Sequence, residues 1–330
     1  MANNQSTPRE INYASRVDKV TLKARATKVI KAILTLVIAI IVLLPVIWMA
    51  MTAFKSRADA VAAPPKVIFE PSMEGFVGLL TQRRQVTEAQ GLDAIRNDPN
   101  LKWYDEVMLK RGQQIVGTSE YVGYLKNSAI TAGVSTILSV ALGLLAAYAF
   151  SRFPVAGKND LLFFILSTRM LPPIVVTIPI FLIYRQLGLY DTTFGLILLY
   201  TVFNLSFSVW LLQGFIDEIP HEYEEAALVD GYSRLQAFFK IVLPQTITGL
   251  AATTVFCLIF AWNEYAFAVM LTAQNARTAP PSIPSVLGTG GIEWAQIAAG
   301  AMGFLIPVAI VTFALRNYLL RGVTFGAVRR

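Results

Sequence analysis

Hydrophobic residues in this chain are concentrated in six long runs that are separated by polar segments. A transmembrane helix rises about 1.5 Å per residue and needs about 20 apolar residues to cross the hydrocarbon core of a bilayer. Each run reaches that length, so the pattern predicts an all-α integral membrane protein with six transmembrane helices. The runs cover residues 32–54, 128–150, 161–184, 194–216, 247–271 and 297–320.

The polar segments suggest how the chain is organised around these spans. A basic tail occupies residues 1–31, and a long loop at 55–123 is expected to form a small extracytoplasmic subdomain with a helix somewhere within 74–97. Residues 124–330 then form the membrane core. This core includes a loop at 217–245, a second loop at 272–293 and a short tail at 321–330.

Positive charge predicts the orientation, because Lys and Arg accumulate in loops on the cytoplasmic side. They are frequent in residues 1–31, in the link 151–160 and in the tail 321–330. With six spans these three segments fall on the same side. We therefore expect a multi-pass inner-membrane protein with cytoplasmic N- and C-termini, and an uncleaved first span rather than a signal peptide.

Composition agrees with lipid as the main solvent, since 55% of the residues are hydrophobic and only 15% are charged. The net charge of +7 is concentrated beside the first span, where it is an orientation signal rather than a nucleic-acid arm. The chain has one cysteine, Cys257, and one histidine, so neither an intrachain disulfide nor a His/Cys metal cluster is expected.

The loop 217–245 has the pattern of two short helices joined by a turn. Pro220 suits a helix start, Gly231 permits the turn, and Ser233 with Gln236 matches a capping box that begins a second helix. We expect Pro244 to end that helix, whose apolar stripe is Leu235, Phe238, Phe239 and Val242. Three interpretations are a DNA-binding helix-turn-helix, an interfacial helix pair on lipid, and a docking element for a partner. Because the loop is acidic, the first is disfavoured.

Sequence motifs in and around this loop resemble a known family. Glu225-Ala226-Ala227, Gly231 and Ile241-x-Leu243-Pro244 match, without gaps, the EAA loop of ABC importer permeases. Asn127-Ser128 and the segments 147–150, 262–265 and 326–328 resemble the smaller pore subunit of maltose-type carbohydrate importers. The long first loop and the ending Arg329-Arg330 depart from that pattern.

This resemblance implies the type I ABC importer permease fold and a pore subunit that moves a carbohydrate or polyol across the bacterial inner membrane. It implies two copies of an ATPase subunit that use ATP and Mg, a second six-span permease subunit and a periplasmic solute-binding protein. Within the loop, Glu225 would make the polar contact that orients the docked helix, and Ala226 and Ala227 would allow close approach. No cofactor, catalytic residue or nucleic-acid partner is expected of this chain itself.

Polar residues inside the predicted spans are candidates for the solute pathway or a gate. Arg169 precedes a double proline in the third span, and a charged residue there usually faces a bundle interior or water. Its alternative role is a structural pair between helices. The same choice applies to a further group of residues, Asn204, Trp262, Asn263 and Glu264. In the loop 272–293, the resemblance implies contact with the binding protein for Gly288, Gly290 and Gly291.

The sequence has no phosphate-binding loop and no set of nucleophile, base and acid, so a permease rather than an enzyme is expected. The alternative is a secondary transporter driven by an ion gradient, which Arg169 and Glu264 would suit. Six spans without an inverted repeat, and a loop with a docking motif, favour the importer. Disaccharide, polyol and glycerol-phosphate importers share this framework, so the solute stays open.

Overall fold

The computed structural model describes residues 13–86, 95, 98–283, 287–288 and 291–316, with only the backbone at 13–26 and 287–288. The described residues up to Met51 form one unit, and those from Thr52 onward form a second. The first unit holds most of helix α1, Tyr13–Ala53, whose apolar part from Thr27 is long enough to cross a membrane. Residues 1–12 of the basic tail lie outside the described residues, and the tail from Tyr13 onward is the start of α1.

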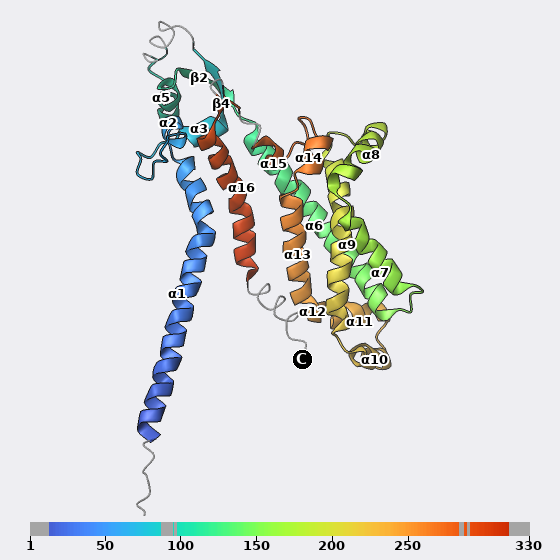
Figure 1. Cartoon of the computed structure of the whole chain (residues 1–330). Coiled ribbons are helices and arrows are strands. Elements are labelled where there is room, and N and C mark those ends of the chain that lie inside the picture. Colours follow the sequence, from blue (N-terminus) through green and yellow to red (C-terminus); the bar gives the residue numbers. More distant parts are fainter. Residues whose placement is uncertain (1–12, 87–94, 96–97, 284–286, 289–290, 317–330) are drawn as a thin grey trace, which may run out of the picture. The chain divides into compact units, whose positions relative to one another are not determined.

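Within the second unit, three uninterrupted helices are long and apolar enough to span a bilayer (Figure 1). They are α6 (Tyr121–Arg152), α9 (Thr193–Asp217) and α16 (Trp294–Ala314). Two bent helix pairs are further candidates, so the described residues contain four spans, or up to six if each pair is one span. Residues 317–320 of the sixth predicted span lie outside the described residues.

The third and fifth apolar runs, each expected to be a single helix, are interrupted. The third consists of α7 (Lys158–Ser167), the short helix η1 (Thr168–Met170) and α8 (Pro173–Gln186). The chain bends by 90° between η1 and α8, where Pro172 and Pro173 supply no backbone N–H groups. In the fifth run, α13 (Ile247–Trp262) ends before the separate helix α14 (Ala266–Leu271).

Helices α6 and α9 form the centre of the second unit and pack through small and hydroxyl-bearing residues. A Cβ atom added to Gly143 on α6 would lie 2.5 Å from the Cβ of Ser208 on α9, so only glycine permits this approach. Close backbone contact of this kind is typical of helices packed in a membrane. The buried residues on α6 and α9 that share this character include Ser135, Ser139, Ser206 and Ser208.

The long loop 55–123 forms a small subdomain that packs on the start of α16 (Figure 1). Helix α3 covers only Glu74–Leu80, and β1 (Thr81–Gln85) then pairs antiparallel with β2 (Gln113–Thr118). We expected a helix somewhere within 74–97. In the described part of that range, only residues 74–80 and Ile95 are helical. A strand pairing across such a sequence distance leaves no local pattern that would predict it. Two further helices are α2 (Arg57–Ala60) and α5 (Trp103–Leu109).

The loop 217–245 forms α10 (His221–Val229), α11 (Arg234–Ala237), η2 (Phe238–Val242) and α12 (Leu243–Gln245). Pro244 was expected to end the second helix, but the helix continues through Gln245. The reason is that η2 is a π-turn, in which Leu243 N–H donates to Phe238 O. Pro244 then falls in the first turn after the π-turn, where its missing N–H is tolerated. The bend, of 73°, comes between Gln245 and Ile247.

Candidate functional site

The first part of the site is the coupling end, which we define as residues 217–246 together with Tyr148 and Arg152. Its helix α10 begins after Pro220 and ends in a Schellman motif. Tyr232 N–H donates to Ala227 O at 3.0 Å, and Gly231 N–H donates to Leu228 O at 3.1 Å. Gly231 has a φ of 86°, a left-handed conformation that glycine adopts without strain. Helix α10 is thus terminated by a defined turn rather than by fraying.

The second helix of the coupling end begins with the predicted capping box. Gln236 N–H donates to the Ser233 hydroxyl, and Ser233 N–H donates to the Gln236 side chain at 2.8 Å. Its apolar stripe divides into two halves. Phe238 and Val242 are buried in the bundle, whereas Leu235 and Phe239 are exposed. One half therefore fixes the helix to this chain, and the other half is available to lipid or to another protein.

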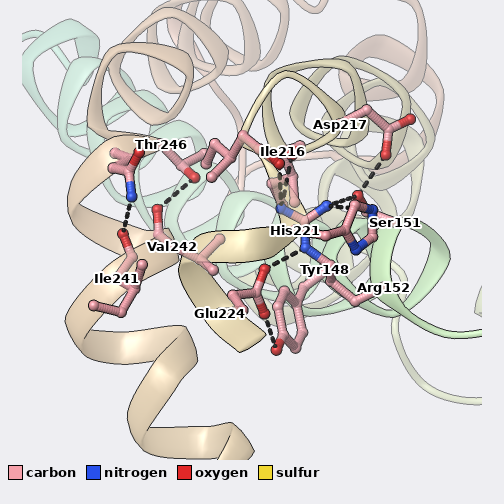
Figure 2. A network of polar contacts seen from close by, with 12 residues as sticks. Tyr148, Ser151, Arg152, Ile216, Asp217, His221, Glu224, Ile241, Val242 and Thr246 are labelled. Atoms are coloured by element: carbon pink, nitrogen blue, oxygen red, sulfur yellow. Dashed lines mark hydrogen bonds and ion pairs between the residues drawn. The ribbon is translucent and has the colours of Figure 1, made fainter. Parts of the chain in front are cut away.

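A buried ion pair attaches α10 to the ends of the two central helices. Figure 2 shows that the Glu224 carboxylate accepts hydrogen bonds from Arg152 Nε and from the Tyr148 hydroxyl, the latter at 2.8 Å. The Arg152 side chain is only 3% exposed, and its Nη2 donates to the carbonyls of Ile216 and Ile219 at 3.1 and 2.9 Å. Arg152 therefore joins the end of α6, the end of α9 and α10 in one contact network.

Tyr148 links both helices of the coupling end. Its hydroxyl bonds Glu224 on α10, while its ring packs against Phe238 in η2 with a centroid distance of 4.7 Å. The side chains of this network line a hollow of about 190 Å³, and Glu225 and Arg234 also line it.

The structure places the motif residues of the loop on different sides of α10. Glu225 and Ala226 are exposed, whereas Ala227 is buried against the chain's own bundle. Further along, Ile241 and Leu243 are half-buried and Pro244 is exposed. Docking roles for these residues stay predictions, and Glu225 and Ala226 are the exposed motif residues on α10 itself.

The sequence pattern did not single out the three side chains that hold α10 in place. In the sequence, Arg152 is one of the basic residues of the link 151–160, and Glu224 is one of several acids in the loop 217–245. One signal was present, because Tyr148 and Arg152 are four residues apart at the end of a span and so share a helix face. Two side chains aligned there can grip the neighbouring loop.

The second part of the site is the loop end, which we define as residues 272–293 together with Asn127, Ser128 and Asp191. Asp191 lies between α8 and α9 with a φ of 54°. Its carboxylate accepts from four consecutive backbone N–H groups, those of Ala273, Gln274, Asn275 and Ala276, at 2.9, 3.3, 3.1 and 3.1 Å. Partial burial raises the pKa of the Asp191 carboxyl, but these four donors outweigh it and hold the pKa below its ordinary value.

Other polar residues fix the remainder of this loop. Asn127 Nδ2 donates to the carbonyls of Asn275 and Arg277, and the Ser128 hydroxyl accepts from Ala279 N–H at 2.9 Å, close to α15 (Ala279–Ser282). At the far end of the loop, Glu293 is 3% exposed and bonds Arg111 of the subdomain at 2.7 Å. The pair Asn127-Ser128 thus has a structural task at the start of α6.

The glycines proposed to contact a binding protein lie in the middle of this loop. Gly288 ends the short strand β3 (Leu287–Gly288) and Gly291 begins β4 (Gly291–Ile292), and these two residues pair across an antiparallel hairpin. Gly290 lies outside the described residues. The loop is therefore anchored at both ends, with a hairpin between its anchors.

The residues Trp262, Asn263 and Glu264 occupy the break between α13 and α14. Trp262 Nε1 donates to Phe304 O at 3.1 Å, and Asn263 Nδ2 donates to Ile259 O at 2.8 Å. Glu264 accepts from the N–H groups of Phe267 and Ala268, which begin α14, and from the Tyr200 hydroxyl at 2.8 Å. The contacts of Trp262 and Glu264 join different helices, whereas that of Asn263 closes the end of α13. A pathway or gate role for the three residues stays a prediction.

Comparison with known proteins places these features in context. Residues 139–325, more than half of the chain, match the family described as binding-protein-dependent transport system inner membrane component. A probable ABC transporter permease protein of Sinorhizobium fredii is 31% identical over 89% of this chain and 92% of its own length. A trehalose/maltose transport system permease protein of Thermococcus litoralis is 30% identical over 92% of this chain and 98% of its own.

A solved structure shares the fold. It is a chain from a bacterial ABC transporter involved in the import of the acidic polysaccharide alginate, with a TM-score of 0.62 and 20% identity. The match covers 90% of this chain and 97% of that chain. The predicted all-α permease fold is thereby confirmed, and the similarity is not confined to the loop that carries the motif.

Proposed function

Because the chain belongs to the family of binding-protein-dependent transport system inner membrane components, we propose that it forms half of the pore of an ATP-driven importer of a sugar or polyol. Trehalose and maltose appear in the name of a relative that matches nearly its whole length, which supports the carbohydrate class. Family membership does not support the ion-gradient alternative.

One observation carries the coupling mechanism: α10 is rigid, buried on one side and exposed on the other. The Schellman motif and the Arg152–Glu224 pair fix its end and its inner side. Its outer side presents Glu225 and Ala226, and exposed Tyr223 and Val229 lie nearby. An ATPase subunit that binds this surface would move α10 as a rigid body, and the buried pair would carry that movement to α6 and α9.

The remaining partners follow from the same scheme. Two ATPase subunits would hydrolyse ATP with Mg, one on this chain and one on a second permease subunit. The coupling end and both termini would lie in the cytoplasm, and the loop end would face a periplasmic binding protein that delivers the solute. In this scheme the Asp191 contacts hold the loop in a fixed position for that protein.

The inner parts of the bundle would supply the pathway. Arg169 and Asn204 line a cavity there, which makes them the candidates for contact with the solute. Glu264 lines the same cavity, but its carboxylate is already occupied by three donors within the chain. We assign Glu264, Trp262 and Asn263 to helix packing at the gate rather than to solute recognition.

The test is copurification from the native membrane in mild detergent, with partners identified by mass spectrometry. The wild-type chain is expected to bring an ATPase, a second six-span subunit and a binding protein. Glu225→Ala is expected to reduce the recovered ATPase several-fold while the second permease remains. Glu218→Ala removes another exposed carboxylate of the same loop, outside α10, and should leave recovery unchanged. A chain that purifies alone and transports without ATP would contradict the proposal.

A further inference from the structure

A cavity of about 210 Å³ lies where the interrupted third span meets α9 and α13. Its wall includes Arg169 and Pro173 from the break in that span, Asn204 from α9, and Phe260 from α13. Ligand pockets that enclose a whole small molecule are usually larger, about 300 Å³ or more. A cavity of this size accommodates one end of a solute, and a facing surface would have to supply the remainder.

Arg169 lies in η1, directly before the 90° bend of the third span. Its guanidinium lies 4.1 Å from the Phe260 ring centroid on α13. The Phe207 ring is 5.2 Å away on α9. Aromatic faces attract a cation, but they leave its N–H groups without acceptors. The two rings therefore contact the guanidinium without accepting conventional hydrogen bonds from its N–H groups.

Among the described residues, Arg169 has no ion pair, and its buried Nη1 has no hydrogen-bond partner. An uncompensated charge in a membrane bundle is costly, so such residues usually pair or face a pathway. Arg152 shows the contrast, because it satisfies a carboxylate and two carbonyls within the chain.

Most of the other polar atoms of the cavity already have hydrogen-bond partners within the chain. Both oxygens of Glu264 accept hydrogen bonds from Tyr200, Phe267 and Ala268. Asn204 Nδ2 donates to the Cys257 carbonyl at 3.1 Å. The donors of Arg169 are thus the main unused binding capacity in the wall, and a guanidinium is suited to grip a carboxylate, phosphate or sulfonate with two N–H groups.

We propose that this cavity receives an anionic group of the transported solute, and that Arg169 is the residue that binds it. Solute hydroxyls would fill hydrogen-bond positions but leave the positive charge uncompensated, whereas an anionic group satisfies both. The inference rests on the proposed function, since the solute must pass this point. It narrows the carbohydrate or polyol to an acidic one, such as a uronate or a phosphate ester.

The experiment compares matched neutral and anionic probes on the importer assembled with its copurified partners in lipid nanodiscs. The pairs are glucose with glucuronate, and glycerol with glycerol 3-phosphate, at constant ionic strength. Thermal unfolding of the permease is followed against probe concentration, because a ligand that binds the folded state raises the unfolding temperature. The variants are Arg169→Gln and Arg169→Lys. Arg185→Gln is the matched control, since Arg185 also lies over two aromatic rings but outside the cavity.

At least one anionic probe is expected to stabilise the wild type at concentrations about tenfold lower than its neutral counterpart. Arg169→Gln should abolish that preference, Arg169→Lys should retain part of it, and Arg185→Gln should retain all of it. Equal shifts within both pairs, or no shift with any probe, would overturn the proposal. A preference for the anionic probe that survives Arg169→Gln would also overturn the proposal. The same holds if the only effect of Arg169→Gln is loss of the second permease subunit.

Failure here is distinguishable from failure of the proposed function. If ATPase recovery depends on Glu225 but the probes show no preference for anions, the importer stands and the cavity assignment falls. If no ATPase is recovered, the probe series is run on the purified chain in nanodiscs. It then tests the cavity without the importer scheme.

Discussion

The coupling end and the loop end are both held by one charged side chain that binds backbone, but with opposite chemistry. At the coupling end, the Arg152 cation binds one carbonyl in the last turn of α9, one carbonyl in the link that follows, and one carboxylate. At the loop end, the Asp191 carboxylate collects four amide N–H groups. Arg152 and Asn127 lie 25 residues apart on α6, a distance of about 37 Å, which exceeds the hydrocarbon core of about 30 Å.

The difference concerns what each contact joins. Arg152 connects secondary structures to one another through a second ionised side chain, so the loss of either partner leaves a buried charge. Among the residues that the structure describes, Asp191 forms no ion pair, and it fixes a loop whose N–H groups can turn to water when they are released. The coupling end is therefore suited to transmit force, and the loop end is suited to hold a surface in position.

The largest expected effect comes from breaking the buried pair. Arg152→Ala leaves Glu224 buried without its cation, and removal of one partner of such a pair costs about 3–5 kcal/mol. The unfolding temperature in mild detergent should fall, and ATP-dependent transport should be lost. Glu224→Ala together with Arg152→Ala should cost clearly less than the sum of the two single changes, as a double-mutant cycle would measure. Additive costs would show that the two residues do not act together.

A second substitution weakens the connection between the coupling end and the loop end. Helices α6 and α9 extend to both ends, so their packing joins them. Gly143→Leu inserts a side chain where a Cβ would meet Ser208 at 2.5 Å, and overpacking costs about 1–3 kcal/mol. Gly133→Leu is the matched control on the same helix, because a Cβ there meets no atom within 4 Å. Unfolding temperature and hydrogen exchange at both ends should change for position 143 only. Equal effects of the two substitutions would show that the close contact of α6 and α9 at Gly143 does not determine their packing.

At the loop end, Asp191→Asn keeps the size of the side chain and tolerates the positive φ, but removes the charge that attracts the four N–H groups. The expected loss is about 2 kcal/mol of local stability. Amides of residues 273–276 should exchange faster, while those of α10 serve as an internal reference and should not change. Unaltered protection of the loop would mean that Asn127 and Ser128 suffice to hold it.

The smallest effect is a dependence on pH that is confined to the loop end. The native pKa of Asp191 lies below its ordinary value of about 3.9, so its stabilising contribution is complete above that value. It is lost as the pH falls through the lowered native pKa. A nitroxide at Gln274→Cys, in a Cys257→Ser background, should stay immobile at pH 5 and gain mobility only below about pH 4. With Asp191→Asn the label should be mobile at every pH. A label that is already mobile at pH 5 in the chain that retains Asp191 would contradict the role of Asp191 in holding the loop.

Prediction from the sequence succeeded where a pattern is local. The capping box at Ser233 and Gln236 and the turn at Gly231 follow from short-range rules, and the structure contains both. The break in the third run also had a local sign in Pro172-Pro173, but nothing in the sequence indicated how large the bend would be. Apolar composition alone cannot distinguish a straight span from a bent one.

The missed features depend on residues that are distant in the sequence. Arg152 meets Glu224, and Asp191 meets residues 273–276, only after the helices pack. The π-turn in η2 is similar, because an inserted residue in a helix leaves no sign in the apolar periodicity. Charged residues at the ends of spans deserve two interpretations: as markers of orientation, and as contacts for a neighbouring loop.

The seam between α6 and α9 also has a consequence for the synthesis of the protein. Helix α6 leaves the ribosome with Ser135, Ser139 and Gly143 on one face, and its partner face with Ser208 is made only after the interrupted third span. At about 5–20 residues per second, α6 waits several seconds in the translocation machinery or the lipid before α9 arrives. Substitutions on this seam should therefore reduce the amount of protein that survives quality control in the cell before they affect the transport rate of each finished molecule.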